Sequence, residues 1–259
     1  MKEVDITRVD LSTGKTSKLR DFVAQEKPLH LLLNGVHVVT ILCLPSDQKE
    51  LAVGHVLSEG IVKTFEEIKN VDLKDDICNI KLSSAADLEK RLKLLKHLSR
   101  VIFSACGSQT PYHPSIRLRK VRSKLSLNAE LILNCVNYLN LKAEIFRKTG
   151  GVHAAAIFKD NGKPAAFAED VGRHNAVDKA IGIASMHKVD LDSCFLTLTG
   201  RLTGDIVLKA ARMGIPVVAS LAAAVDTGIE IAKEANLTLV GFARGKRMNV
   251  YTFPERIIS

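Results

Sequence analysis

The chain has 259 residues, of which 46% are apolar and 25% are charged, a composition that excludes a disordered protein and suits one large domain or two smaller ones. Its longest run of small apolar residues, 215–225, is too short for a membrane-spanning helix, and the N-terminus carries acids where a signal peptide needs an apolar core. The net charge of +9 favours acidic partners, such as nucleic acid, phosphorylated ligands or acidic proteins. We therefore expect a cytoplasmic protein that does not bind to membranes.

The first hundred residues have the pattern of a mixed α/β unit. Two strand-like runs, 29–33 and 36–44, flank Asn34-Gly35, a pair typical of a tight β-hairpin turn. A helix is expected at 48–58, with Gly60 free to end it in a left-handed conformation. A second helix is expected at 86–98, where apolar residues recur at helical spacing and the basic residues face solvent.

The chain after residue 128 alternates regularly between helical and strand-like segments. Helices are expected at 129–139, 176–186, 205–213 and 229–235, and strands at 152–158, 164–170, 194–199, 216–220 and 238–242. The turn at 160–162 predicts a hairpin between the first two of these strands. Alternation of this kind indicates a largely parallel sheet with helices on both faces.

The five cysteines are an odd number and are scattered along the chain. No Cys-x-x-Cys pair is present, so neither a metal clip nor a disulfide framework is expected. Cys43, Cys78, Cys135 and Cys194 each lie in an apolar segment, which predicts that they pack in the core.

Cys106 has a different neighbourhood, because the flanking Ser104, Ala105, Gly107 and Ser108 are all small. After a strand-like run, such residues predict an exposed turn, and the basic stretch at 117–124 could lower the pKa of a thiol near it. An accessible thiolate can attack a sulfur or carbon electrophile and carry the product elsewhere. On these residues alone, however, a small side chain in a tight turn is the simpler interpretation.

Three loops in the second half combine glycine with a cation directly after an apolar strand. They are EDVGRHN (169–175), TGRLTGD (199–205) and ARGKR (243–247), and the first two open directly into helices. Helix N-termini and basic side chains at the carboxyl ends of strands suit a phosphate-rich ligand. Each loop taken alone also fits an ordinary glycine turn, with Asp170, Asp205 and Asp226 acting as helix caps. Three such loops at one sheet edge favour a binding site.

His153 and His174 are expected to be packed core residues. Zinc deaminases use His-x-Glu with a distant Pro-Cys-x-x-Cys. Here the first motif is replaced by His153-Ala154-Ala155 and the second is absent. We therefore exclude a deaminase mechanism and expect no zinc.

Several long segments together resemble one family. They are LAVGHVLSEGIV (51–62), FSACGSQT (103–110), TGGVHAAAIF (149–158), EDVGRHNAVDKAIG (169–182) and the stretch 199–252, which begins TGRLTGDIVLKAARMG. In this order they are similar to the formate dehydrogenase accessory sulfurtransferases, the FdhD/NarQ family. The resemblance covers most of the chain.

The resemblance implies an α/β fold in which a small N-terminal α/β domain (1–102) precedes a cytidine-deaminase-like three-layer α/β/α domain (103–259), usually assembled as a homodimer. It also implies a sulfur carrier that accepts sulfur from a cysteine desulfurase. The sulfur would pass to the Mo-bis(molybdopterin guanine dinucleotide) cofactor, bis-MGD, before this cofactor enters the catalytic subunit of formate dehydrogenase.

The site residues follow from the same resemblance. The persulfide cysteine of the family falls on Cys106. The cofactor-binding segment falls on Phe242, Ala243, Arg244, Gly245, Lys246 and Arg247, and Arg173 and Arg201 are expected to help hold the guanine dinucleotide ends.

The chain departs from the family at one position. The usual Cys-Gly-x-Cys loop reads Cys106-Gly107-Ser108-Gln109, so the persulfide would have to hand its sulfur directly to the metal. This leaves open a cofactor-binding chaperone without sulfur transfer. Nucleic-acid binding is a third hypothesis, based on charge, but the chain has no tryptophan and three tyrosines, which provide few stacking platforms.

Overall fold

The computed structural model describes residues 1–83, 101–102, 118 and 120–258. The strands are β1 (Lys2–Asp10), β2 (Lys15–Val23), β3 (Lys27–Leu33), β4 (Val36–Cys43), β5 (Ile68–Lys74), β6 (Ile77–Leu82), β7 (Val101–Ile102), β8 (Leu127–Asn128), β9 (His153–Lys159), β10 (Pro164–Asp170), β11 (Cys194–Leu198), β12 (Val217–Ser220), β13 (Thr238–Arg244), β14 (Arg247–Val250) and β15 (Ile257–Ile258). The helices are α1 (Gln48–Ser58), α3 (Ala129–Lys142), α4 (Glu144–Thr149), α5 (Arg173–Met186), α6 (Gly204–Arg212) and α7 (Asp226–Ala235), with short 3₁₀ helices at Phe65–Glu67, Leu191–Ser193 and Pro254–Arg256.

The larger sheet contains six strands in the order β10-β9-β11-β12-β13-β14. Only β11 with β12 and β12 with β13 pair in parallel; the other three pairs are antiparallel. The expectation of a largely parallel sheet was therefore wrong. Tight turns at 160–163 and 245–246 join antiparallel strands at the two edges of the sheet, and a short turn can join strands only in that orientation.

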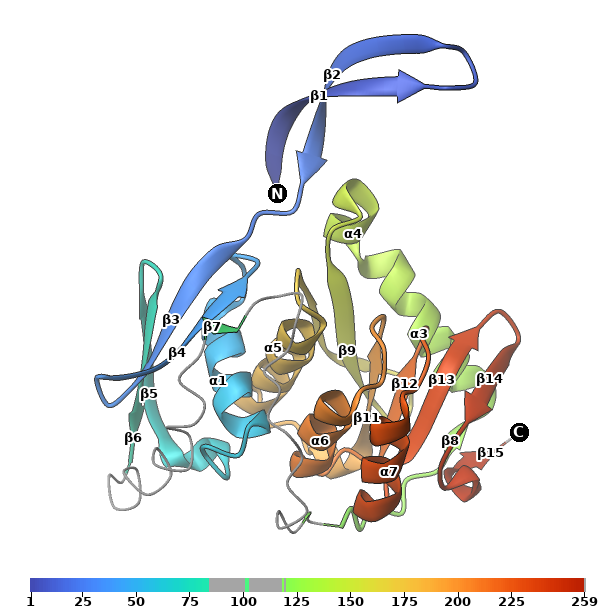
Figure 1. Ribbon diagram of the computed structural model, residues 1–259. Helices are drawn as coiled ribbons and strands as arrows, with labels where there is room; N and C mark the ends of the chain where they lie inside the picture. Colours follow the sequence, from blue (N-terminus) through green and yellow to red (C-terminus); the bar gives the residue numbers. More distant parts are fainter. Residues whose placement is uncertain (84–100, 103–117, 119, 259) are drawn as a thin grey trace.

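Helices cover both faces of this sheet, as the sequence predicted (Figure 1). Alternate residues of β9 point to opposite sides: Ala155 and Ile157 pack under α5, α6 and α7, whereas Ala156 and Phe158 pack under α3. The core beneath α3 contains aromatic side chains. The rings of Phe158 and Phe195 stack there, with their centroids 5.5 Å apart. This second half is thus a three-layer α/β/α sandwich.

The smaller sheet contains five strands in the order β5-β6-β3-β4-β7. Asn34 and Gly35 join β3 to β4 with φ values of 49° and 82°, which confirms the predicted hairpin, because a two-residue turn of this type needs positive φ at both positions. Helix α1 covers one face with its own hydrophobic core and has the bounds predicted from the sequence. Gly60 ends that helical region with φ of 71°.

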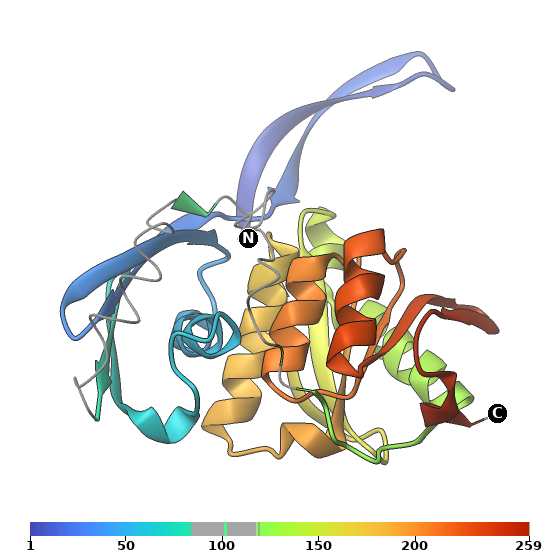
Figure 2. The same ribbon diagram turned by 60° about the horizontal axis from the view of Figure 1, so that its bottom comes forward.

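The two halves meet where α1 packs on α5, and Figure 2 shows α1 between the smaller sheet and the sandwich. A glycine on each helix allows the close approach. A Cβ atom at Gly54 would overlap the carbonyl oxygen of Asp178, and one at Gly182 would overlap the carbonyl oxygen of Glu50. The contact is therefore backbone against backbone.

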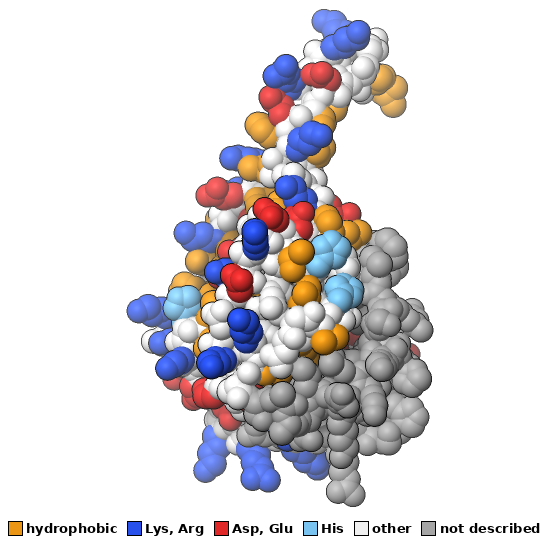
Figure 3. All heavy atoms as spheres, turned by 90° about the vertical axis from the view of Figure 1, so that its left-hand side faces the viewer, with side chains coloured by type: hydrophobic (Ala, Val, Ile, Leu, Met, Phe, Trp, Pro, Cys, Tyr) orange, Lys and Arg blue, Asp and Glu red, His pale blue; other side chains and the backbone are white. Residues whose placement is uncertain are grey.

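Strands β1 and β2 form an isolated antiparallel hairpin that projects from the rest of the chain (Figure 1). The sequence analysis missed this arm. Cations and acids mix along it, and apolar side chains reach its tip (Figure 3), where Val9 is 61% and Leu11 is 93% exposed.

The other predicted elements are confirmed with small changes in their bounds, and the helix expected at 129–139 continues to Lys142. The helix expected at 86–98 lies outside the described residues. Among the helices that are described, none is long and apolar enough to cross a membrane.

Candidate functional site at the strand ends

The three glycine loops leave the same edge of the larger sheet. Strand β10 is antiparallel to β9 and β9 is antiparallel to β11, so β10 runs in the same direction as β11, β12 and β13. The carboxyl ends of these four strands therefore meet at one edge. The loops at 169–175, 199–205 and 243–247 all begin there, as the sequence predicted.

The first two loops pack against one another. Gly200 lies against the side chain of Arg173, and a Cβ atom at Gly200 would stand only 2.9 Å from the Cβ of that arginine. Ser220, at the end of β12, holds the second loop by donating a 2.6 Å hydrogen bond to the carbonyl oxygen of Gly200. The glycine thus brings the backbone before Arg201 close to the start of α5.

His153 lies beside these loops, at the amino end of β9. Its Nδ1 is 3.2 Å from the hydroxyl of Thr199, and the amide of Ala154 also donates to that hydroxyl, at 3.1 Å. Burial, followed by the charges of Arg173 and Arg201, lowers the pKa of His153. The imidazole is half-buried and not a packed core residue, so this expectation from the sequence was wrong.

The third loop is a hairpin turn between β13 and β14, and Gly245 within it has φ of 61°. A bulge in β13 puts Phe242 in the left-handed region with φ of 51°. The guanidinium of Arg244 lies 5.5 Å from the centre of the Phe242 ring, within range of a cation–π contact. Arg244, Lys246 and Arg247 extend into solvent, whereas Ala243 is buried.

Two hollows line this sheet edge on the side of α3. We call the first the α3 hollow; it has a volume of about 230 Å³. It is lined by Leu133, Asn134, Asn137, Asn140, Leu221, Ala243, Arg244 and Gly245. We call the second the histidine hollow; its volume is about 480 Å³, and Asn140, Phe146, Gly151, His153, Thr199 and Leu221 are among the residues that line it. The two hollows share Asn140 and Leu221 and are therefore adjacent, and we call them together the groove.

Asp170 holds the first loop in place, but not as a helix cap. Its carboxylate forms a fully buried 2.7 Å ion pair with Lys179 and accepts hydrogen bonds from the amides of Gly172 and Leu44. Among the described residues, the N-cap residues of α5, α6 and α7 make no side-chain capping hydrogen bond. Of the three acids for which capping was the alternative interpretation, only Asp226 accepts a hydrogen bond from a first-turn amide, that of Thr227 at 2.7 Å. Asp170 instead ties the end of β10 to the first half of the chain.

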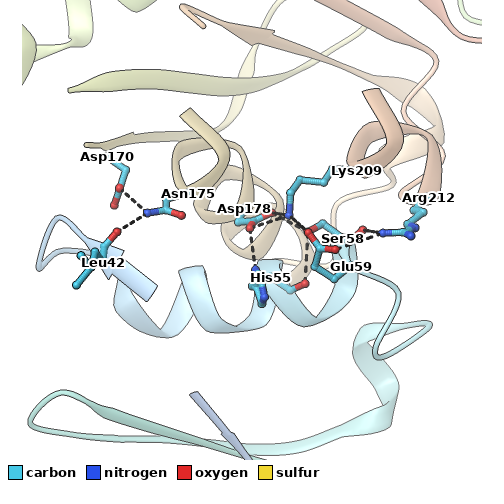
Figure 4. A network of polar contacts seen from close by, with 9 residues as sticks. All are labelled: Leu42, His55, Ser58, Glu59, Asp170, Asn175, Asp178, Lys209 and Arg212. Atoms are coloured by element: carbon cyan, nitrogen blue, oxygen red, sulfur yellow. Dashed lines mark hydrogen bonds and ion pairs between the residues drawn. The ribbon is translucent and has the colours of Figure 1, made fainter. Parts of the chain in front are cut away.

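A second buried polar network lies where α1, α5 and α6 meet (Figure 4). The ammonium of Lys209 is 2.9 Å from Asp178 and 2.6 Å from Glu59, and it also donates to the hydroxyl of Ser58. His55 lies 3.2 Å from the same carboxylate of Asp178. Burial alone would raise the pKa of Asp178, but Lys209 and His55 outweigh it and hold that pKa below its usual value.

His174 adjoins this network, and neither of its ring nitrogens has a hydrogen-bond partner among the residues that the structure describes. Its Nε2 is 3.9 Å from Asp205, at the start of α6. Burial, with the nearby charges of Lys209 and Arg173, lowers its pKa to about 3, so the imidazole is neutral at physiological pH. Its burial confirms the expectation that it is a packed residue.

The predicted nucleophile, Cys106, and its neighbour Gln109 lie outside the described residues. The other four cysteines are buried, as predicted. Burial raises the pKa of Cys43 and Cys78 to about 12, and that of Cys135 and Cys194 to about 11. These four thiols are therefore protonated and inaccessible at neutral pH.

In the part of the chain that the structure describes, no three His, Cys, Asp or Glu side chains gather in a group that could hold a metal ion. The groove offers the side-chain amides of α3, the hydroxyl of Thr199 and the guanidinium of Arg244 instead. Such groups bind phosphates and the edges of nucleobases.

Comparison with known proteins identifies the family. The model of the FdhD/NarQ family matches residues 24–258. The chain belongs to the FdhD/NarQ family. This FdhD/NarQ chain is 33% identical over 237 residues to the sulfur carrier protein FdhD of Wolinella succinogenes, with 92% of this chain and 82% of that protein covered. It is 34% identical over 262 residues to the sulfur carrier protein FdhD of Saccharolobus solfataricus, with 99% and 98% covered.

A solved structure from Desulfotalea psychrophila, assigned as a formate dehydrogenase accessory protein, has the same mixed α/β fold. The TM-score is 0.78 at 26% sequence identity, and the match covers 99% of both chains. The match to this solved structure therefore includes the arm, which precedes the residues that the family model matches.

Sequence reasoning missed the contribution of α3 to the groove. Asn134, Asn137 and Asn140 recur every three residues in a helix, and this spacing was the available signal. An exposed polar face of a helix does not reveal what lies opposite it. Only the structure brings these amides next to Arg244.

Proposed function

We propose that this protein is a sulfur carrier for the maturation of formate dehydrogenase. Cys106 accepts sulfur from a cysteine desulfurase as a persulfide and passes it to the molybdenum of bis-MGD, before this cofactor enters the catalytic subunit of formate dehydrogenase. The observation that carries the proposal is the groove, where three basic glycine loops converge in a chain that shares its family with proteins named sulfur carriers. Such a groove suits the phosphate-rich tails of the cofactor.

The first transfer conserves electrons. The Cys106 thiolate attacks the terminal sulfur of the donor persulfide, so one S–S bond breaks, another forms, and the donor leaves as a thiolate. In the second transfer the sulfur leaves Cys106 for the metal and the thiolate is regenerated. The metal centre must then supply the two electrons that reduce sulfane sulfur.

Charged side chains in the groove and beside it are suited to hold the cofactor. Arg173 and Arg201 lie within electrostatic reach of His153, and Arg244 lines the neighbouring α3 hollow. Planar guanidinium groups bind phosphate oxygens in a forked geometry. We assign the pyrophosphates of the guanine dinucleotides to these arginines and to the segment from Phe242 to Arg247.

We also propose the domain arrangement that the resemblance implies. Residues 1–102 would form the small α/β domain and residues 103–259 the cytidine-deaminase-like domain, with two copies assembled as a dimer. Separate hydrophobic cores beneath α1 and on the two faces of the larger sheet support this division.

A cofactor chaperone without sulfur transfer is the alternative, and Gln109 is the observation that favours it. The second cysteine of the usual family loop is absent here. Such a chaperone would still need the basic groove, but it would not need the thiol of Cys106.

Formate dehydrogenase activity in cells that lack their own copy of this protein separates the two functions. We expect Cys106→Ala to abolish the activity and Arg244→Ala to reduce it at least tenfold, because sulfur and cofactor must both be held. Cys135→Ala is the matched control for loss of a cysteine. If Cys106→Ala supports full activity while Arg244→Ala does not, the chaperone function is correct.

A further inference from the structure

Three asparagines form an amide row along one side of α3. Asn134, Asn137 and Asn140 are exposed, and all three line the α3 hollow opposite Arg244. No hydrogen bond within the described residues uses their side-chain amides, which are therefore available to a ligand. Helix α3 lies beside β13 (Figure 1), so the row faces the strand that carries Arg244.

Packing fixes the direction in which the row faces. Ile132, Cys135, Val136 and Leu139 are buried against the sheet, so the helix cannot rotate without exposing its apolar stripe. Asparagine is also a poor helix former and costs roughly 0.5 kcal/mol relative to alanine at each position. Three asparagines on the side that borders the groove therefore lower the stability of the helix and gain no packing contact in return.

We propose that this amide row reads the base of a guanine nucleotide whose phosphates are held by Arg244 and the turn that follows it. The inference rests on the proposed function, since it assigns a base-reading role to residues in the site where that function needs a nucleotide tail. Leu133 and Leu221, which line the same hollow, are apolar neighbours for the faces of the base.

The chemistry of the two purines gives the row a basis for selectivity. An asparagine amide presents one acceptor oxygen and two donor hydrogens. Guanine offers the O6 acceptor next to N–H donors, whereas adenine carries a donor amine at the same position. An amide N–H that donates to O6 of guanine would face the donor amine of adenine, so no hydrogen bond could form there. Sites built from hydrogen bonds discriminate strongly against analogues that lack the matching group.

Calorimetric titration of the full-length protein with GDP, IDP and ADP tests the inference. We expect the wild-type protein to bind GDP at least tenfold more tightly than ADP, with IDP, which lacks the 2-amino group, between them. Asn137→Leu should weaken GDP binding about tenfold and leave ADP binding unchanged, so that the preference disappears. Asn70→Leu, on β5 of the smaller sheet, is the matched control and should change neither.

The leucine variant separates a loss of recognition from a loss of folding, because leucine is a better helix former than asparagine and the net charge is unchanged. Its thermal midpoint should equal or exceed that of the wild type. A GDP preference that persists in Asn137→Leu and in the triple Asn134/Asn137/Asn140→Leu variant, while Arg244→Ala abolishes binding, would overturn the inference and leave the proposed function intact. A wild-type protein that binds none of the three nucleotides would contradict both.

Discussion

Lys209 links the two halves of the chain through buried ion pairs. It is buried in α6, and its ammonium lies 2.9 Å from the carboxylate of Asp178 on α5 and 2.6 Å from that of Glu59, which directly follows α1. Asp178 is buried and the Glu59 side chain is 13% exposed. Burial alone would lower the pKa of Lys209, but the charges of Asp178 and Glu59 outweigh it and raise that pKa. The three charges are stable in the interior only as a group.

Lys209→Met should therefore destabilise the protein by about 3–5 kcal/mol, because it leaves the buried Asp178 without its ammonium partner and Glu59 with only its 3.6 Å pair to Arg212. Urea unfolding at pH 7, followed by circular dichroism, measures this loss. Arg20→Met is the control, since Arg20 is 69% exposed and its pairs with Glu3 and Asp5 lie on the arm; a change below about 1 kcal/mol is expected there. Equal effects of the two substitutions would show that the buried network is not stabilising.

Helices α1 and α5 are the elements whose packing joins the two halves. Gly54 and Gly182 let the helices approach until the backbone of each touches the glycine of the other. A helix interior normally disfavours glycine by about 1 kcal/mol relative to alanine. Close packing of the two helices offsets that cost here.

Gly54→Ala should accordingly destabilise the protein, by about 1–3 kcal/mol, despite the better helix propensity of alanine, because the methyl group would overlap the carbonyl of Asp178. Thermal unfolding detects the change. Lys49→Ala, at an exposed position of the same helix, should have an effect within about 0.5 kcal/mol. An unchanged or raised midpoint of thermal unfolding for Gly54→Ala would mean that the two helices can move apart without a loss of stability.

The sequence was informative about single elements and less so about how they pair. Asn34-Gly35 predicted the hairpin because only a few residue types tolerate its backbone conformation. The helix expected at 48–58 was found as α1 with the same bounds. No local sequence signal reports the direction of a strand. The alternation of helices and strands therefore led to the wrong prediction of a largely parallel sheet. The arm was missed although Val4 and Ile6 alternate with polar residues there.

The candidate site was predictable to a similar degree. Glycine beside a cation after an apolar strand identified the three loops, and the topology brings them to one edge. His153 was misassigned because its apolar neighbours resemble a core strand. The network at Lys209 was out of reach of sequence reasoning, since His55 and Asp178 are separated by 123 positions and a polar residue in a helix gives no sign of its partner.

At the scale of the whole molecule, the arm lies outside the region that the family model matches. The family match begins at residue 24, immediately after β2 ends at Val23. Yet the relative from Saccharolobus solfataricus matches over 99% of the chain. An isolated two-stranded hairpin is marginally stable in water. The groove and both sheets lie outside the arm, so the proposed sulfur and cofactor chemistry belongs to the matched region.

The account as a whole depends on one reactive thiol among five cysteines. Four are buried with pKa values raised to about 11 or 12, which leaves Cys106 as the proposed carrier. The most direct test is to incubate the full-length protein with a cysteine desulfurase and cysteine, and to map the mass gain of one sulfur atom by peptide. We predict the gain on the peptide that contains Cys106, and its loss in Cys106→Ala but not in Cys135→Ala. Sulfur on a different cysteine, or no transfer from a desulfurase that carries its own persulfide, would contradict the account.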